Sequence, residues 1–187
     1  IIFEGNGYSN EWENEIKDRG LSNKTNTIDA ILILKDKTMT SVLTDFDILS
    51  DTEIESRYEI MLDNYCKTIQ VEASTALKMA SNEIFPACLN YLNKVAETSV
   101  NVSKNNIDNK FLVEEIKDLT KLLEIMKTRI EDLKLSIEKA QSIKNDVLKA
   151  AKVWKDEVLV TMSNLRTIVD SLENKVLVIR EANQRKS

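Results

Sequence analysis

Apolar residues recur at alternating spacings of four and three positions through the middle of the chain. The series covers about four heptads, the repeat that gives a helix one apolar stripe for packing against other helices. Its members are Leu112, Ile116, Leu119, Leu123, Met126, Ile130, Leu133, Ile137 and Ala140. Acidic and basic residues three positions apart, such as Glu131 and Lys134, lie outside the stripe. Each such pair adds only about 0.2–0.5 kcal/mol, so the apolar stripe is the main evidence for one long amphipathic helix.

A second apolar series precedes that helix and begins at a helix-start motif. Ser50 and Glu53 have the spacing of a capping box, in which the serine hydroxyl accepts from the third helical amide and the glutamate accepts from the serine amide. Pro86 removes one helical hydrogen bond, so we expect a kink near residues 82–86 rather than an end. The pattern stops in the asparagine-rich residues 101–109, which we expect to form a loop. The apolar positions are Ile54, Tyr58, Met61, Leu62, Tyr65, Ile69, Ala73, Ala76, Leu77, Ala80, Ile84, Leu89, Leu92, Val95 and Ala96.

The last apolar series runs toward the C-terminus and contains one irregular step. Two consecutive steps of four place a stutter near Met162, which should locally unwind any supercoil. No glycine or proline marks the turn before this helix, and we place that turn at residues 141–145. The members of the series are Val147, Ala151, Trp154, Val158, Met162, Leu165, Val169, Leu172, Val176 and Ile179.

Together the three series predict an all-α fold in which residues 50–187 form an antiparallel bundle of long helices, the first of them kinked near Pro86. All three glycines lie within the first 20 residues and Pro86 is the one proline, so the strongest interrupters of regular structure are nearly absent from this region. A parallel coiled-coil rod is the alternative, but a rod would need no loops.

Residues 1–49 have a different pattern and predict a short irregular junction segment with short helices. Ser9 is a candidate cap for a helix that ends at Gly20, since acidic residues in its first turn suit a helix N-terminus. Residues 28–34 and 40–49 contain short apolar runs that fit either a helix or a strand, and residues 1–3 fit the end of a strand.

Charge is distributed unevenly between these regions. Residues 1–64 contain 14 acidic and 6 basic residues, a net charge of −8, and the remaining residues contain 17 and 20, a net charge of +3. No dense basic stripe is available to neutralise phosphates, which argues against nucleic-acid binding. No apolar stretch approaches the roughly 20 residues of a membrane-spanning helix, and no signal peptide opens the chain. Because the first residue is isoleucine, we expect the chain to begin inside a longer polypeptide, after processing, or where order begins.

The two cysteines are too far apart in sequence to bridge on one helix. Cys66 and Cys88 are 22 positions apart, which is roughly 33 Å along a helix at about 1.5 Å per residue, whereas a disulfide needs Cα atoms within about 7 Å. Two thiols without a bridge favour a reducing compartment, and we expect a cytoplasmic protein. The chain has no histidine to activate a cysteine, so buried structural thiols are the preferred interpretation.

No residue pattern predicts a catalytic, cofactor-binding or metal-binding site, and we assign no residue to any of these. Glu114 and Glu115 are adjacent carboxylates, but neighbours on a helix diverge by about 100° and cannot converge on one substrate atom. Residues 5–7, Gly-Asn-Gly, lack the lysine and hydroxyl residue of a phosphate loop and are interpreted as a turn. Without histidine, and with no calcium-loop motif, the chain predicts no metal site. Large side chains in the apolar series are interpreted as core rather than as a ligand pocket. They are Met61, Met79, Met126, Met162 and Trp154.

Several short motifs occur in a fixed order along nearly the whole chain. They are IFEGNGYSNEW (2–12), RGL (19–21), TIDA (27–30), ESRYEI (55–60), YCKTIQVEA (65–73), IFPA (84–87), DEV (156–158) and MSNLR (162–166), with Asp170 and Glu173 in register after them. In order and spacing they resemble the C-terminal part of type III glutamine synthetase.

The resemblance implies a parent enzyme that makes glutamine from glutamate, ammonia and ATP through a γ-glutamyl phosphate, with Mg or Mn ions held by carboxylates. In that family the metal and nucleotide sites lie in a β-rich catalytic region, which would precede Ile1, and the subunits form dodecamers of two hexameric rings. Residues 1–49 would then be the end of the catalytic region. The family usually ends in a Trp-Pro-Phe-Pro-Tyr-like tail, whereas this chain ends with EANQRKS at residues 181–187.

Two functions follow from these observations. The leading hypothesis is the C-terminal helical domain of a glutamine synthetase, non-catalytic alone and structural, assembly-related or regulatory, with the catalytic region of the same polypeptide and further copies of it as partners. The alternative is a stand-alone helical interaction or sensor module of coiled-coil type, which rests on the heptads. Neither reading predicts a nucleic-acid or membrane partner. The choice between ring assembly and regulation, and the oligomeric state of the fragment, stay open.

Overall fold

Helices account for all the regular structure in the described part of the chain, which confirms the all-α prediction. The computed structural model describes the backbone of residues 4–184 and the side chains of residues 4–176. The chain divides into two compact units, one that ends at Tyr65 and one that begins at Cys66. The predicted strand end at residues 1–3, the side chain of Ile179 and the last residues of the chain lie outside the described residues. The domain boundary predicted between residues 49 and 50 stays a prediction.

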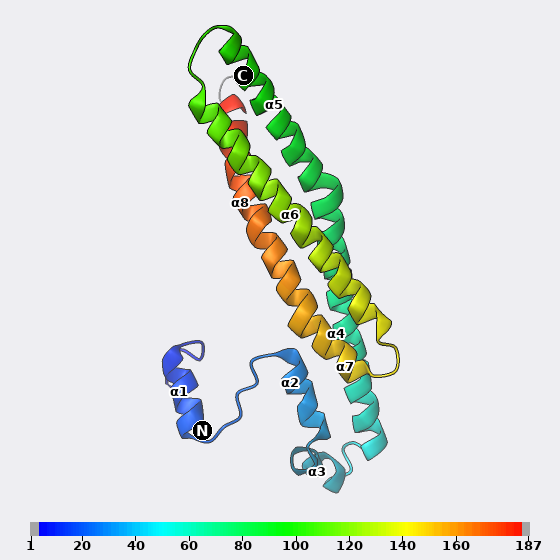
Figure 1. Ribbon diagram of the computed structural model, residues 1–187. Helices are drawn as coiled ribbons and strands as arrows, with labels where there is room; N and C mark the ends of the chain where they lie inside the picture. Colours follow the sequence, from blue (N-terminus) through cyan, green and yellow to red (C-terminus); the bar gives the residue numbers. More distant parts are fainter. Residues whose placement is uncertain (1–3, 185–187) are drawn as a thin grey trace. The chain divides into compact units, whose positions relative to one another are not determined.

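The N-terminal unit begins with a short helix (Figure 1), and this helix has the predicted cap. Helix α1 spans Asn10–Asp18, and the Ser9 hydroxyl accepts from the amide of Trp12 at 3.4 Å. Glu11 and Glu13 lie in its first turn. Gly20 follows the helix with a φ of 66°, a left-handed conformation that glycine adopts without steric cost. The predicted cap and terminator of this helix are confirmed.

The first ambiguous apolar run of the junction is helical, and the second is helical as far as Asp45. Helix α2 spans Thr27–Ile31, the short 3₁₀ helix η1 spans Leu32–Lys35, and α3 spans Lys37–Asp45. Asn26 caps α2, since its side chain accepts from the amide of Asp29 at 3.0 Å. Local capping by short polar side chains therefore selects helix over strand in these runs.

Helix α4, Asp51–Met79, begins at the predicted capping box. The Ser50 hydroxyl accepts from the amide of Glu53 at 3.3 Å, and the Glu53 carboxylate accepts from the amide of Ser50 at 2.8 Å. The reciprocal bonds satisfy two amides that the first helical turn leaves without partners.

Helix α4 continues past Pro86 through a π-helical turn. The π segment η2 spans Ala80–Ile84, and α5 follows directly as Phe85–Lys104. A π turn contains about one residue more than an α turn. The next buried residue after Ala80 is therefore Cys88. The prediction that the helix does not end near Pro86 is confirmed, and a π turn lies where a kink was expected. The assignment of Leu89 to the core is wrong, because the extra residue rotates it to the exposed surface.

A second π turn accounts for the stutter in the last apolar series. Helix α7 spans Val147–Val153, the π segment η3 spans Trp154–Val158, and α8 spans Leu159–Gln184. Trp154 and Val158, the first and last residues of this wider turn, are both buried. The local underwinding therefore lies about one turn before Met162.

The second unit is an antiparallel bundle in which α5, α6 and α8 lie side by side (Figure 1). Helix α6 spans Lys110–Ser142. It is joined to its neighbours by residues 105–109 and 143–146, so the first loop is shorter than predicted, and the second turn begins two residues and ends one residue later than predicted. The bundle core includes Leu119, Leu123, Met126, Leu133, Ile137, Ala140, Trp154, Val158, Leu165 and Leu172.

Two methionines of α4 do not belong to the core. Met61 and Met79 are exposed, whereas Met126 and Trp154 are fully buried as predicted. In α4 the neighbouring positions Leu62 and Ala80 are the buried ones. Each exposed methionine thus lies next to the buried stripe, where helical periodicity alone does not separate core from edge.

Candidate functional site

The adjacent carboxylates of α6 have different surroundings. Glu114 is exposed, whereas Glu115 forms an ion pair with Lys175 of α8, at 3.1 Å between Nζ and Oε2. The same Nζ lies 3.7 Å from a carboxylate oxygen of Asp118. Burial raises the pKa of Tyr91 on α5, and the Glu115 carboxylate raises it further. This cluster connects helices of the bundle and does not align two carboxylates for acid–base chemistry.

The two cysteines differ in burial. Cys88 is buried on α5 and Cys66 is half-buried on α4. Burial raises the pKa of the Cys88 thiol, and the carboxylate of Glu173 adds to that effect. A raised pKa keeps the thiol protonated at neutral pH, which disfavours its use as a nucleophile.

A shallow groove of about 390 Å³ lies between α6 and the first turns of α8. Leu135 and Val160 give it two exposed apolar side chains. At its edge, Lys139 forms an ion pair with Glu157 at 2.6 Å. The hydroxyls of Ser136 and Thr161 are 2.9 Å apart across the two helices. Because these polar groups bind one another, the groove has the features of a helix–helix contact rather than of a reactive site.

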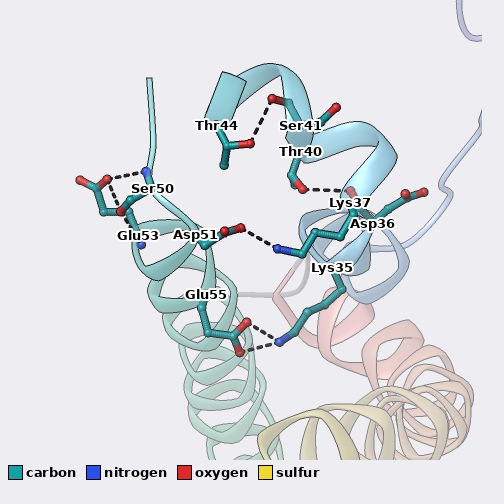
Figure 2. A network of polar contacts seen from close by, with 10 residues as sticks. All are labelled: Lys35, Asp36, Lys37, Thr40, Ser41, Thr44, Ser50, Asp51, Glu53 and Glu55. Atoms are coloured by element: carbon teal, nitrogen blue, oxygen red, sulfur yellow. Dashed lines mark hydrogen bonds and ion pairs between the residues drawn. The ribbon is translucent and has the colours of Figure 1, made fainter. Parts of the chain in front are cut away.

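In the N-terminal unit, two lysines connect η1 and α3 to the first turns of α4 (Figure 2). Lys35 forms an ion pair with Glu55 and lies over the ring of Tyr58, with Nζ 4.4 Å from the ring centroid. Lys37 pairs with Asp51 at 2.6 Å. The hydrogen bond to Glu55 raises the pKa of Lys35. Both lysines therefore serve contacts within this unit.

The turn predicted at residues 5–7 lies at residues 6–9. The amide of Ser9 donates to the carbonyl of Asn6 at 3.0 Å, and the amide of Tyr8 donates to the Asn6 side chain at 3.0 Å. Among the residues that the structure describes, no group of three or more His, Cys, Asp or Glu side chains is placed to hold a metal ion. None of the helices in that same part of the chain is long and apolar enough to span a membrane.

Comparison with known proteins identifies the family. A sequence model of the glutamine synthetase C-terminal domain matches residues 1–104 of this chain, more than half of its length. The chain belongs to the glutamine synthetase C-terminal domain family. The matched part includes α1 to α5, so the resemblance carried by the motifs in residues 2–87 is confirmed.

Curated relatives extend the match beyond α5. The chain is 34% identical over 98 residues to a type-3 glutamine synthetase of Dictyostelium discoideum, covering 52% of this chain and 13% of the relative. It is 26% identical over 182 residues to a glutamine synthetase of Bacteroides fragilis, covering 94% of this chain and 25% of the relative. It is 29% identical over 176 residues to a glutamine synthetase of Butyrivibrio fibrisolvens, covering 92% of this chain and 25% of the relative. This glutamine synthetase C-terminal domain spans a quarter or less of each of these relatives.

The interhelical ion pairs were not predicted from the sequence. Lys175 and Glu115 are 60 positions apart, and only the relative placement of α6 and α8 brings them together. Charge periodicity predicted pairs within α6, and the pair Glu131–Lys134 is present at 3.9 Å. A charged residue next to an apolar stripe position can contact the neighbouring helix. The place of Glu115 next to Ile116 was therefore an indication of a contact across the bundle.

Proposed function

We propose that this chain is the non-catalytic C-terminal helical domain of a longer glutamine synthetase polypeptide, with a structural role in supporting or assembling its catalytic region. The match of the family domain to residues 1–104 carries this proposal. The bundle supports a structural role, because its polar side chains Lys175, Glu115, Lys139 and Glu157 are used in contacts between helices.

The proposed parent reaction is the ATP-dependent ligation of ammonia to glutamate. The donor groups within the described residues do not fit a metal site. We propose that ATP and Mg²⁺ or Mn²⁺ bind in the part of the polypeptide that this chain does not span. The proposed partners are that catalytic region and further copies of the whole polypeptide, as a dodecamer, in the cytoplasm.

An activity comparison tests the proposal. The whole polypeptide and residues 1–187 alone are purified separately, and each is assayed for ATP-dependent γ-glutamyl hydroxamate formation. We expect turnover by the whole polypeptide and none by the chain alone. Turnover by the pure chain would show that it contains a catalytic site. An inactive whole polypeptide would instead favour the stand-alone interaction module.

A further inference from the structure

Helix α3 exposes its apolar face. Met39, Val42 and Phe46, the α3 stripe, lie within about 60° of one another around the helix axis at 100° per residue. Their side chains are 58%, 56% and 75% exposed. An amphipathic helix of a globular protein normally turns such a stripe toward the core. Among the residues that the structure describes in the N-terminal unit, none covers this apolar face.

The opposite face of α3 carries hydroxyl groups and is turned inward. Thr40 is buried, and its hydroxyl donates to the carbonyl of Asp36 at 3.1 Å. The Thr44 hydroxyl donates to the carbonyl of Ser41 at 3.1 Å. Figure 2 shows both bonds, together with the Lys37–Asp51 pair that attaches the start of α3 to α4. Since the inward hydroxyls have partners, burying them leaves no unsatisfied group, and the orientation of α3 is compatible with a stable fold.

Acidic residues flank the α3 stripe at both ends of the helix. Asp36, Asp45 and Asp47 are exposed at or just beyond the ends of α3, while the nearby Lys37 is paired with Asp51. A symmetric contact between two copies would place the same surface on both sides and bring acids opposite acids, which is unfavourable. The chemistry of this surface instead fits a partner with an apolar centre and a basic rim.

We propose that the α3 stripe is the surface through which this domain docks on the remainder of its own polypeptide. The inference rests on the proposed function, since it needs a longer polypeptide. The matched segment accounts for 25% or less of each relative, so those proteins have a large further region that can supply the partner surface. Apolar patches left open on a soluble unit mark interaction sites, and a stripe of three large side chains provides the anchor that such a contact needs.

Methionine labelling by hydroxyl radicals, read by mass spectrometry, tests the proposal on the whole polypeptide and on residues 1–187 alone. Met39 reports on the stripe, and the exposed Met61 and Met79 of α4 serve as internal references. We expect Met39 labelling to fall several-fold in the whole polypeptide relative to the chain alone. The variant Phe46→Ser should restore fast labelling of Met39, and the matched variant Phe111→Ser, which changes an exposed phenylalanine of α6, should not.

The outcomes separate the docking proposal from the proposed function. An active whole polypeptide in which Met39 is labelled as fast as in the chain alone overturns the docking and leaves the proposed function standing. An inactive one overturns the proposed function. Slower labelling of the chain alone at higher concentration identifies a second copy as the occupant and also overturns the docking. Slow labelling of the buried Met126 in both variants verifies that they are folded.

Discussion

The bundle and the N-terminal unit place their apolar stripes in opposite ways. In the bundle, Leu119, Met126 and Leu133 of α6 are fully buried. In the N-terminal unit, Met39 and Val42 of α3, and Phe46 directly after it, are more than half exposed. The same kind of helical spacing underlies both stripes. The difference teaches that periodicity predicts which face of a helix is apolar but not whether its partner belongs to the same chain.

The two regions also differ in what holds them together. The bundle removes large aliphatic and aromatic side chains from water, a favourable term of about 1.5–3 kcal/mol for each fully buried one. The connection of η1 and α3 to α4 relies on exposed ion pairs of Lys35 and Lys37, and such pairs contribute about 0–1 kcal/mol. The bundle should therefore dominate the stability of the chain.

The largest expected effect comes from a charge in the bundle core. Leu133 is 0% exposed and Leu135, two positions later on α6, is 54% exposed. Leu133→Asp buries an unpaired charge and should cost about 3–5 kcal/mol, whereas Leu135→Asp should change stability by about 0.5 kcal/mol or less. Thermal unfolding followed by circular dichroism measures both. Equal shifts would mean that the buried face of α6 is misassigned. Ile130→Asp should fall between them, because Ile130 is only half-buried.

A smaller effect is expected at the capping box, as a pH dependence. The hydrogen bond from the Ser50 amide lowers the pKa of Glu53 below its usual 4.5. A lowered pKa in the folded state stabilises the fold above the unfolded value, and that stabilisation is lost as the pH falls through the folded value. Wild type should therefore exceed Glu53→Gln in stability near neutrality, and the two should converge in acid. Urea titrations at several pH values measure this, and a constant difference would contradict it.

The cross-helix pair of the bundle should have a still smaller, salt-dependent effect. Lys175 and Glu115 are each about one-third exposed, so solvent screens their attraction. A double-mutant cycle with Lys175→Ala and Glu115→Ala should give a coupling of about 0.2–1 kcal/mol that decreases with added salt. A coupling that does not change with salt would indicate a contact other than the ion pair.

The smallest effect is expected at the α3 stripe in the isolated chain. Phe46→Ser removes a side chain that is 75% exposed, so its loss should change the free energy of unfolding by about 0.5 kcal/mol or less. Denaturant unfolding of residues 1–187 measures the change. A large destabilisation would mean that α3 is already packed within this chain, and the contrast between the two regions would fail.

The sequence predicted the helices well because their determinants are local. The capping box at Ser50, the cap at Ser9 and the heptads of α6 each specify a helix from neighbouring residues. Pro86 and the stutter near Met162 indicated irregular turns, and the structure has a π turn shortly before each of them. The form of these turns was not predictable, because it depends on which residues the packed bundle keeps buried.

Features that depend on contacts distant in sequence could not be predicted. The exposure of Met61, Met79 and Leu89 follows from the exact rotation of α4 and α5. The Lys175–Glu115 pair follows from the packing of α6 against α8. The outward orientation of the α3 stripe depends on how α3 lies against residues outside it, such as Asp51, which pairs with Lys37. No local pattern in residues 37–45 distinguishes that orientation from its reverse.

The most direct test of the contrast between the two regions is amide hydrogen exchange on residues 1–187 alone. In a self-contained bundle, the central amides of α6 should exchange only through global unfolding. The amides of α3, which has an exposed apolar face, should exchange many times faster through local opening. Protection concentrated in α6 and low in α3 is the predicted result. Equal protection of α3 and α6 would show that the N-terminal unit is as fully packed as the bundle, and would contradict the account.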